Sequence, residues 1–356
     1  MYQILTEIGN RFRLAGTFSG YETVKNGNIN KTYKVTYKTG DGETKSYIFQ
    51  KVNTSVFKNP VEIMANIDRV TSHIREKCGG KPTLHYRHTP SGENYAYDRD
   101  GGFWRIMNCI DSVTFDTCDD PAVLRAAGEA FGSFQLQLAD FDGSVLYETS
   151  PDFHTTRKRL DTLFSDAEAS ERTPDVTAEL ETIRAFSDTA CLLCNRYERH
   201  EFPVRVTHND TKANNVLFDR ETLQPLTVID LDTVMPGMVM YDFGDAVRFL
   251  ANTAAEDEPD LEKVSFDTAK FTAFAEGFLG QVKDSVTQAE IDSMVLGAFS
   301  ITIELAARFL DDYLNGDTYF KVNYPGHNLV RARCQLHLAK DILQKREELE
   351  QIVKSI

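Results

Sequence analysis

The chain has 356 residues, and its 54 acidic and 39 basic side chains give a formal net charge of −15. A surface of this sign repels polyanions, so the charge argues against nucleic acid and anionic membranes as partners. Hydrophobic residues make up 41% and charged residues 26% of the chain, which is typical of a soluble globular protein with one large or two ordinary domains.

Targeting and redox signals favour the cytoplasm. The N-terminus "MYQILTEIGNRF" lacks the basic and then apolar segments of a signal peptide, and no window approaches about 18 uninterrupted apolar residues. The six cysteines are scattered, and the close pair Cys191 and Cys194 lies in an apolar helical run. We therefore interpret this pair as buried thiols rather than a redox or metal site. We also expect no membrane partner, and we favour a monomer.

The first hundred residues are predicted to form mostly strands. Apolar and polar residues alternate in Thr32–Tyr37 and Ser46–Val52, and the turn "TGDG" between them predicts a β-hairpin. From Asn59, apolar residues recur at helical spacing, and a second hairpin is expected to turn at 98–102. This portion is therefore predicted to be a small sheet with one inserted helix.

From Asp119 onwards the pattern is mainly helical. Asp120 as N-cap and Pro121 at the first helical position predict a helix that continues to Leu138. Further helices are expected at 176–200, at 266–280, after a capping box of Thr287 and Glu290, and from about Leu329. Short strands are expected at Val204–Thr207, Val216–Phe218 and Thr227–Leu231.

This order of elements predicts an α+β protein with two lobes and a cleft between them. The small β-rich N-lobe is expected to span residues 1–107 and the hinge residues 108–111. The larger helical C-lobe is expected to span residues 112–356.

The stretch "RVTHNDTKANNVLFD", at 205–219, carries polar residues at spacings that suit phosphoryl transfer. That reaction needs a carboxylate to orient and deprotonate the acceptor hydroxyl, oxygen ligands for Mg²⁺ on the nucleotide phosphates, and a cation near the γ-phosphoryl group. Asp210 fits the first role and Lys212 the last. Asn215, five residues after Asp210, and Asp230, at the end of the strand "LTVID", fit the metal role.

These residues also carry a family resemblance. "HNDTKANN" resembles the kinase catalytic loop, in which His-x-Asp is followed by Lys two residues on and by Asn five residues on. Leu231 and Asp232 follow Asp230 in place of Phe and Gly, and no Ala-Pro-Glu element comes after them. With "MPGMVMYDFGDAVRF", the pattern resembles the aminoglycoside phosphotransferase and choline kinase superfamily of small-molecule kinases rather than protein kinases. The resemblance implies a protein-kinase-like fold, ATP as co-substrate and Mg²⁺ as cofactor.

Within that superfamily, further strings resemble the bacterial N-acetylhexosamine 1-kinases. They are "GNINKTYKV", "NTSVF", "IDLDTVMPG", "RFLDDYLNGDTYF" and "YPGHNLVRAR", and the resemblance extends over about residues 8–340. The implied reaction is ATP-dependent phosphorylation of the anomeric hydroxyl of N-acetylglucosamine or N-acetylgalactosamine. Two alternatives stay open. One is a kinase of the same fold for another sugar, an amino alcohol, homoserine or an aminoglycoside, and the other is a catalytically silent nucleotide- or sugar-binding module.

The nucleotide phosphates are expected to lie against the N-lobe strands. Gly27, Asn28 and Asn30 form a short polar loop whose main-chain amides can approach phosphates, although the Gly-x-Gly-x-x-Gly pattern is absent. The family register places Gln50, not a lysine, at the position of the usual strand lysine. Either a bulge recruits Lys51, or Gln50 donates a neutral hydrogen bond and Mg²⁺ offsets more of the phosphate charge.

Two other parts of the nucleotide site follow from the resemblance. The helix acid that normally pairs with the strand lysine, Glu62 or Asp68, has no assigned partner here. The hinge residues Cys109 and Ile110 are expected to contact adenine through main-chain groups.

The remaining candidates surround the catalytic loop. The resemblance implies that His208 and Asp242 brace this loop, and Asp245 is interpreted as a helix-capping acid. Asp232 is expected to bind substrate, with a metal or capping role as the alternatives. In "ELAARFLDDY", residues 304, 308 and 311 share one helix face, which in the resemblance lines the sugar pocket. We therefore expect Arg308 and Tyr319 to contact the sugar, against a surface ion pair of residues 304 and 308.

Overall fold

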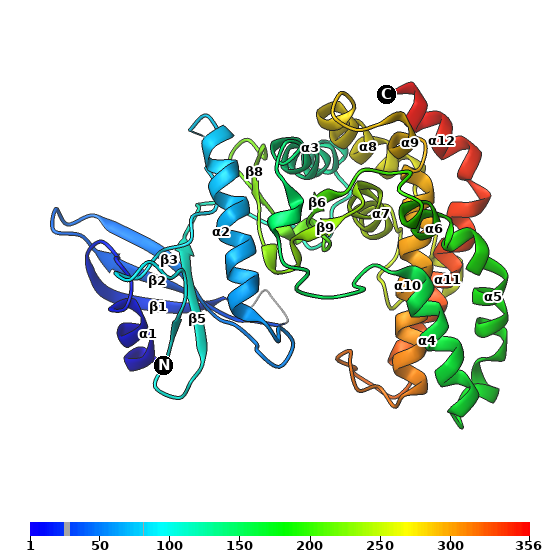
Figure 1. Ribbon diagram of the computed structural model, residues 1–356, viewed down its shortest axis with the longest axis horizontal. Helices are drawn as coiled ribbons and strands as arrows, with labels where there is room; N and C mark the ends of the chain where they lie inside the picture. Colours follow the sequence, from blue (N-terminus) through cyan, green and yellow to red (C-terminus); the bar gives the residue numbers. More distant parts are fainter. Residues whose placement is uncertain (25–28, 81) are drawn as a thin grey trace.

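A computed structural model describes residues 1–24, 29–80 and 82–356, and it has two lobes (Figure 1). The N-lobe contains a five-stranded antiparallel sheet with strand order β1-β2-β3-β5-β4. The strands are β1 (Thr17–Val24), β2 (Lys31–Lys38), β3 (Thr44–Lys51), β4 (Ala96–Tyr97) and β5 (Phe103–Asn108). Both predicted hairpins are therefore confirmed.

Helix α1 (Tyr2–Gly9) was not predicted from the sequence. It buries Leu5 and Ile8 in a small apolar cluster under the sheet, together with Phe49 and Trp104. Only these two side chains of α1 are large, apolar and buried, so the segment is too short for periodicity to reveal it. The cluster stabilises one face of the sheet, and Arg105 on the other face contacts the next helix along the chain and the C-lobe.

Helix α2 (Pro60–Lys77) stands between the sheet and the C-lobe (Figure 1). It begins with Pro60 in its first turn, as expected after Asn59, and it buries Met64, Ile67 and Val70. These residues belong to the large apolar core that continues into the C-lobe. Packing of α2 therefore links the two lobes.

The C-lobe is helical, as predicted. Its first helix is α3 (Pro121–Gln137). Asp120 is the N-cap of this helix, and its side chain accepts a hydrogen bond from the Ala122 amide. The remaining helices are α4 (Thr156–Ala169), α5 (Thr177–Ala190), α6 (Leu192–Glu198), α7 (Val239–Leu250), α8 (Thr268–Val282), α9 (Gln288–Ile291), α10 (Met294–Leu314), α11 (His327–Gln344) and α12 (Arg346–Ser355). The Thr287 capping box is present, but a break at 292–293 separates α9 from α10. The helix predicted over 176–200 is likewise divided, at Cys191.

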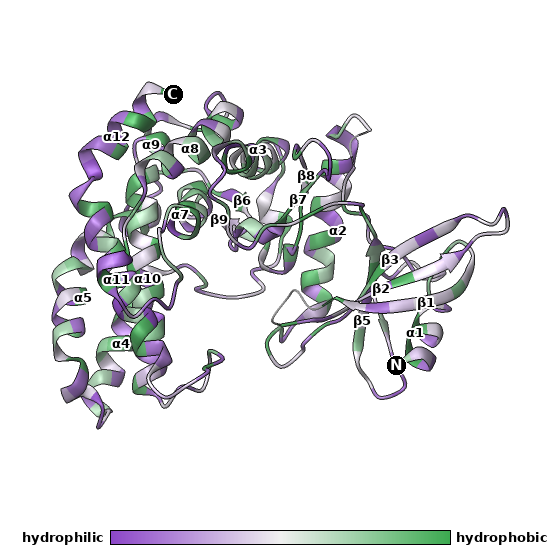
Figure 2. Cartoon of the chain, turned by 180° about the vertical axis from the view of Figure 1, so that it is seen from behind, coloured by the Kyte–Doolittle hydropathy of each residue, from purple (hydrophilic) through white to green (hydrophobic). Residues whose placement is uncertain are grey.

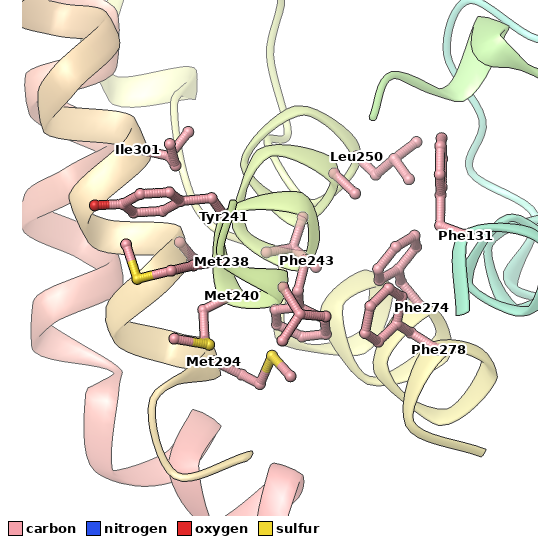
Figure 3. Packing of buried hydrophobic residues seen from close by; sticks show 14 of the residues in the cluster. Phe131, Met238, Met240, Tyr241, Phe243, Leu250, Phe274, Phe278, Met294 and Ile301 are labelled. Atoms are coloured by element: carbon pink, nitrogen blue, oxygen red, sulfur yellow. The ribbon is translucent and has the colours of Figure 1, made fainter. Parts of the chain in front are cut away.

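Helix α7 lies at the centre of this lobe. Phe243 packs edge-on against Phe278 of α8, with ring centroids 5.4 Å apart, and Met294 of α10 lies beside them (Figure 3). A Cβ added to Gly244 would lie 2.5 Å from the main chain of Gly297, so glycine allows α7 and α10 to approach closely. The outer helices α5 and α12 carry many hydrophilic residues (Figure 2). Helix α7 is therefore buried, and its side chains are held in place by the helices around it.

Among the described residues, no helix is both long enough and apolar enough to cross a membrane.

Candidate active site

The loop at 208–212 is fastened to α7 by two buried carboxylates. Asp242 accepts hydrogen bonds from the main-chain amides of His208 and Asn209, both at 2.8 Å, and Asp245 accepts one from the Thr211 amide at 3.0 Å. Burial raises the pKa of Asp242. Burial opposes ionisation of Asp245 too, but the Arg248 guanidinium outweighs it and lowers the pKa of that carboxyl. Helix α7 therefore fixes the main chain of the loop.

His208 is fully buried and sits under the same loop. Its Nε2 donates to the main-chain oxygen of Ile229 at 2.8 Å, and its Nδ1 accepts from the Asp210 amide at 3.3 Å. The rings of Phe131 and Phe134 pack edge-on against it. Both nitrogens are thus used to shape the loop, which is the bracing role that the resemblance implied.

Asp210 and its neighbours form the centre of the site. Lys212 Nζ lies 2.8 Å from Asp210 Oδ1, so the two predicted catalytic side chains are in contact. Asn215 donates through Nδ2 to the main-chain oxygen of Asp210 at 2.8 Å and to its Oδ2 at 3.3 Å. These contacts use Nδ2 of the Asn215 side chain and not its Oδ1, and the Asp210 side chain is 29% exposed.

The turn after β8 (Pro225–Val228) differs from the prediction. The strand expected over Thr227–Leu231 ends at Val228, Asp230 adopts a left-handed backbone with φ 63°, and Leu231–Thr233 forms one 3₁₀ turn. Asp230 and Asp232 therefore do not continue a strand with one common face. A left-handed backbone is uncommon for residues other than glycine, although Asp tolerates it better than most, and Asp152 and Asp317 adopt it too. Burial, followed by the charges of Asp232 and Asp210, raises the pKa of Asp230 to about 7.

The donor set fits a divalent cation with few protein ligands. The main-chain amide of Ile229 donates to the Asn215 main-chain oxygen at 2.8 Å, which holds the Asp230 turn beside the loop. In the described ranges, no group of three or more His, Cys, Asp or Glu side chains is arranged to hold a metal. Asn215 and Asp230 offer hard oxygen atoms, and Mg²⁺ commonly takes one or two such ligands together with phosphate oxygens and water.

The N-lobe side of the site is described in part. Gly27 and Asn28 lie outside the described residues. Asn30 directs its Nδ2 to Asp232 Oδ2 at 2.9 Å and accepts the Asn53 amide at 3.0 Å through its own oxygen. Gln50 donates to Thr32 Oγ1 at 3.1 Å. Asn30 thus joins the sheet to the Asp230 turn.

Lys51 is not recruited towards the cleft. The pairing of β2 with β3 and of β3 with β5 has no register shift through Lys51. Its Nζ lies 2.9 Å from Asp98 Oδ2 on the other face of the sheet. Of the helix acids, Asp68 pairs with His88 at 3.1 Å. The bulge offered as one way to replace the strand lysine is therefore absent.

Arg105 is the cation that sequence analysis missed. It lies on β5 opposite Gln50 and is 1% exposed, with its Nε 2.9 Å from Gln50 Oε1 and its Nη2 3.0 Å from Asp232 Oδ2. Its Nη1 donates to the other Asp232 oxygen. Asp232 is thereby held in a buried ion pair, and its predicted contact with substrate stays a prediction. A charged residue inside the apolar strand "FWRIMN" was the available signal, since a buried arginine needs a partner.

The hinge follows β5 directly. Cys109 and Ile110 come immediately after this strand, and Ile110 packs against the large apolar core. Its main-chain oxygen accepts a hydrogen bond from Ser112 Oγ at 3.0 Å. Their contact with adenine stays a prediction.

The C-lobe wall of the site comes from α10 and the start of α4. Glu304 is 1% exposed and lies 2.9 Å from His154 Nδ1, rather than forming a surface ion pair with Arg308. His154 Nε2 lies 3.3 Å from the Asn209 main-chain oxygen, next to Asp210. Burial would lower the pKa of His154, but the Glu304 carboxylate outweighs it and raises that pKa. The wall therefore contacts the catalytic loop through His154.

Arg308 and Tyr319 lie together, and their predicted contact with a sugar stays a prediction. The Arg308 guanidinium lies 5.9 Å from the centroid of the Tyr319 ring, 5.4 Å from that of Phe320 and 5.8 Å from that of Phe153. Tyr319 is 68% exposed. In the part of the chain that the structure describes, Arg308 forms no ion pair, and its cation faces aromatic rings.

A separate cavity of about 390 Å³ lies between α2, α3 and β8. Ile74, Phe134 and Leu231 are among its lining residues, and no residue of the loop at 208–215 lines it. The chemistry described above is therefore not located in this cavity.

The sheet of the N-lobe, the helical C-lobe and the braced loop between them define a protein-kinase-like phosphotransferase fold. Residues 20–274, more than half of the chain, match the family described as the phosphotransferase enzyme family. The chain therefore belongs to this family.

Solved structures with the same fold are named for different acceptors. An aminoglycoside phosphotransferase from Alicyclobacillus acidocaldarius is 12% identical with a TM-score of 0.63, and the match covers 98% of this chain and 96% of that one. A choline kinase from Cryptosporidium parvum is 15% identical with a TM-score of 0.55, covering 93% and 89%. A spectinomycin phosphotransferase in complex with ADP and spectinomycin is 13% identical with a TM-score of 0.53, covering 95% and 94%. At these identities the likeness concerns the fold.

Proposed function

We propose that this protein transfers the γ-phosphoryl group of ATP to the anomeric hydroxyl of an N-acetylhexosamine, GlcNAc or GalNAc, and so forms the 1-phosphate. The transfer itself is supported by the contact between Asp210, Lys212 and Asn215 on a loop that α7 fixes. The ADP complex of the related spectinomycin phosphotransferase supports ATP as co-substrate.

In this proposal, Asp210 orients the acceptor hydroxyl and removes its proton as the phosphoryl group is transferred. Lys212, held 2.8 Å from Asp210, offsets charge on the transferring group. Asn215 and Asp230 would hold Mg²⁺, which would supply charge stabilisation on the phosphate oxygens. Positioning and electrostatics then provide most of the rate enhancement, because phosphoryl transfer requires little covalent chemistry from the protein.

The single observation that favours a sugar over a cationic acceptor is the charge of the C-lobe wall. Among the described residues Arg308 forms no ion pair, and its guanidinium faces the rings of Phe153 and Tyr319. Burial, and then the charge of Arg308, lower the pKa of Arg159, so the two guanidinium groups are neighbours. Two neighbouring guanidinium groups disfavour the ammonium group of choline or an aminoglycoside. Hydroxyl and amide oxygens of an acetylated sugar accept hydrogen bonds from arginine, and its apolar ring face suits the rings of Tyr319 and Phe153.

An acceptor panel tests this proposal. ADP release would be measured with GlcNAc, GalNAc, glucosamine, choline, homoserine and kanamycin, with EDTA as the metal control. We expect the N-acetylhexosamines to be the best acceptors and glucosamine, which carries an ammonium group, to be much poorer. Turnover of only a cationic acceptor would overturn the sugar assignment.

A matched pair of sugars locates the reacting hydroxyl. The methyl glycoside of GlcNAc keeps every group except the free anomeric hydroxyl, so we expect it to give no product. Equal turnover of the glycoside would place the reaction at another hydroxyl. Binding of ATP with no turnover of any acceptor would favour the silent binding module.

A further inference from the structure

One buried cluster joins the two lobes directly at the Asp230 turn. Arg105 of β5 and Asp232 of the C-lobe are 127 positions apart, and their side chains are only 1% and 3% exposed. Both oxygens of the carboxylate accept from the guanidinium, which is the bidentate geometry that fixes the plane and position of a carboxylate. Asp232 is therefore held in one orientation by the N-lobe.

The rest of the cluster also comes from the N-lobe. Gln50 accepts from Arg105 Nε at 2.9 Å, which sets the rotamer of the arginine. Asn30, the residue just before β2, donates to Asp232 at 2.9 Å while its own oxygen accepts the Asn53 amide. The Asp232 carboxylate thus receives donors from β5 and from the residue just before β2.

This arrangement acts on a candidate metal ligand two residues away. Asp230 has a left-handed backbone, and the 3₁₀ turn that follows it carries Asp232. A left-handed Asp is strained unless its surroundings determine it, and the bidentate contact with Arg105 supplies such a constraint. Residues that orient a metal ligand without touching the metal commonly set the affinity of the site.

We propose that Arg105 and Asp232 are a positioning pair that couples the N-lobe sheet to the geometry of the metal ligand Asp230. The pair does this in place of the usual strand lysine, and its cation holds a carboxylate of the C-lobe instead of contacting the phosphates. The inference rests on the Mg²⁺–nucleotide site of the proposed function, but it does not depend on which acceptor is used.

The test measures the gain in ADP affinity that Mg²⁺ provides. Calorimetry would give the Kd of ADP in excess Mg²⁺ and in EDTA for the wild type, Arg105→Gln and Asp232→Asn. The gain is the ratio of the Kd in EDTA to the Kd in Mg²⁺, and we expect it to be about tenfold smaller in both variants, as for other changes beside a metal ligand. The Kd in EDTA should stay within about twofold of the wild-type value. Lys51→Met is the matched control, because it removes a cation from the opposite face of the same strands, and the gain should be kept.

A double variant separates a pair from two independent residues. If Arg105 and Asp232 act only through each other, the Arg105→Gln/Asp232→Asn protein loses no more of the gain than the worse single variant. Arg105→Lys, which keeps the charge but not the two-pronged contact, is expected to lose part of the gain. This variant decides the question if Arg105→Gln does not fold.

The outcomes are distinguishable. An unchanged gain in the folded variants overturns this inference alone. An equal loss of affinity in EDTA and in Mg²⁺ overturns it as well, because Arg105 would then act on the phosphates themselves. A wild type that binds ADP without any gain from Mg²⁺ overturns the proposed function, and the inference with it.

Discussion

Two ion pairs occupy opposite faces of β3 and β5, and they differ in what they join. On one face, Lys51 pairs with Asp98 beside Trp104, and all three residues belong to the N-lobe. On the other face, Arg105 donates to Gln50 beside it and pairs with Asp232 in the C-lobe. Neighbouring positions of the two strands thus provide a local contact and a contact between lobes.

The difference follows from the alternation of strands. Residues 50 and 51 project to opposite faces, as do residues 104 and 105. The Asp98 carboxylate also accepts the amides of Asp100 and Gly102, so it closes the hairpin between β4 and β5. A similar pair of charges therefore stabilises a turn on one face and, in our proposal, positions a metal ligand on the other.

The largest expected effect is on kcat, and it distinguishes Asp210 of the catalytic loop from Asp98 of the hairpin. We expect Asp210→Asn to lower kcat at least about a hundredfold, because the amide cannot accept the proton of the acceptor hydroxyl. ADP affinity and the melting temperature should change little. Steady-state kinetics with the best acceptor and calorimetry with ADP check this, and an unchanged kcat would remove Asp210 from the role of base.

Asp98→Asn is expected to do the reverse. Replacing this carboxylate weakens its contacts with Lys51 and Trp104 and should lower the free energy of unfolding by about 2 kcal/mol. Burial opposes ionisation of Asp98, but hydrogen bonds from Trp104 and Lys51 lower its pKa from 3.8 to about 2. Its contribution to stability is therefore complete above about pH 5 and is lost as the pH falls towards 2.

Urea unfolding of the wild type and Asp98→Asn at a series of pH values measures this contribution. The difference between them should shrink below pH 3.8. Asp100→Asn, an exposed neighbour, is the control and should change stability by less than about 0.5 kcal/mol. If Asp98→Asn changed kcat and left stability unchanged, Asp98 would act on catalysis and not on the hairpin.

The same contrast explains what the sequence could predict. The contacts of Asp210 with Lys212 and Asn215 span two and five positions, so their spacing is visible in the chain. Arg105 and Asp232 meet across 127 positions, and only the register of β3 with β5 shows that Arg105 lies beside Gln50. Asp230 was assigned to a strand because its neighbours are apolar, but its left-handed backbone depends on contacts with distant residues.

Exchanging arginine and lysine on the two faces should give a smaller effect on kcat. Arg105→Lys should lower kcat about tenfold, because lysine cannot reproduce the bidentate contact that fixes Asp232 beside a metal ligand. Lys51→Arg should leave kcat unchanged, since its partner Asp98 lies outside the cleft. Both variants would be assayed at saturating Mg²⁺ and ATP, and equal kcat values for the two would contradict the distinction between the faces.

Asp312 provides the smallest and most selective test, because it is buried like Asp98 but fastens the loop that carries Tyr319. Its carboxylate accepts the amides of Thr318, Tyr319 and Phe320 at 2.7 to 2.9 Å. Asp312→Asn brings an amide N–H against one of these donors, so the loop that carries Tyr319 should loosen. We expect the KM of the acceptor to rise about threefold, with kcat and the KM of ATP unchanged.

The control for this variant is Asp341→Asn on α11. Asp341 also fastens a distant loop, since it accepts the amide of Phe266 at 2.6 Å and the hydroxyl of Ser265 at 2.8 Å. The Asp341→Asn variant should therefore lower the melting temperature, as Asp312→Asn does, and leave the KM of the acceptor unchanged. An acceptor KM that rises equally in both would show that loss of stability alone weakens acceptor binding. A rise confined to Asp312→Asn would connect the loop of Tyr319 to the acceptor, because the two carboxylates fasten different loops.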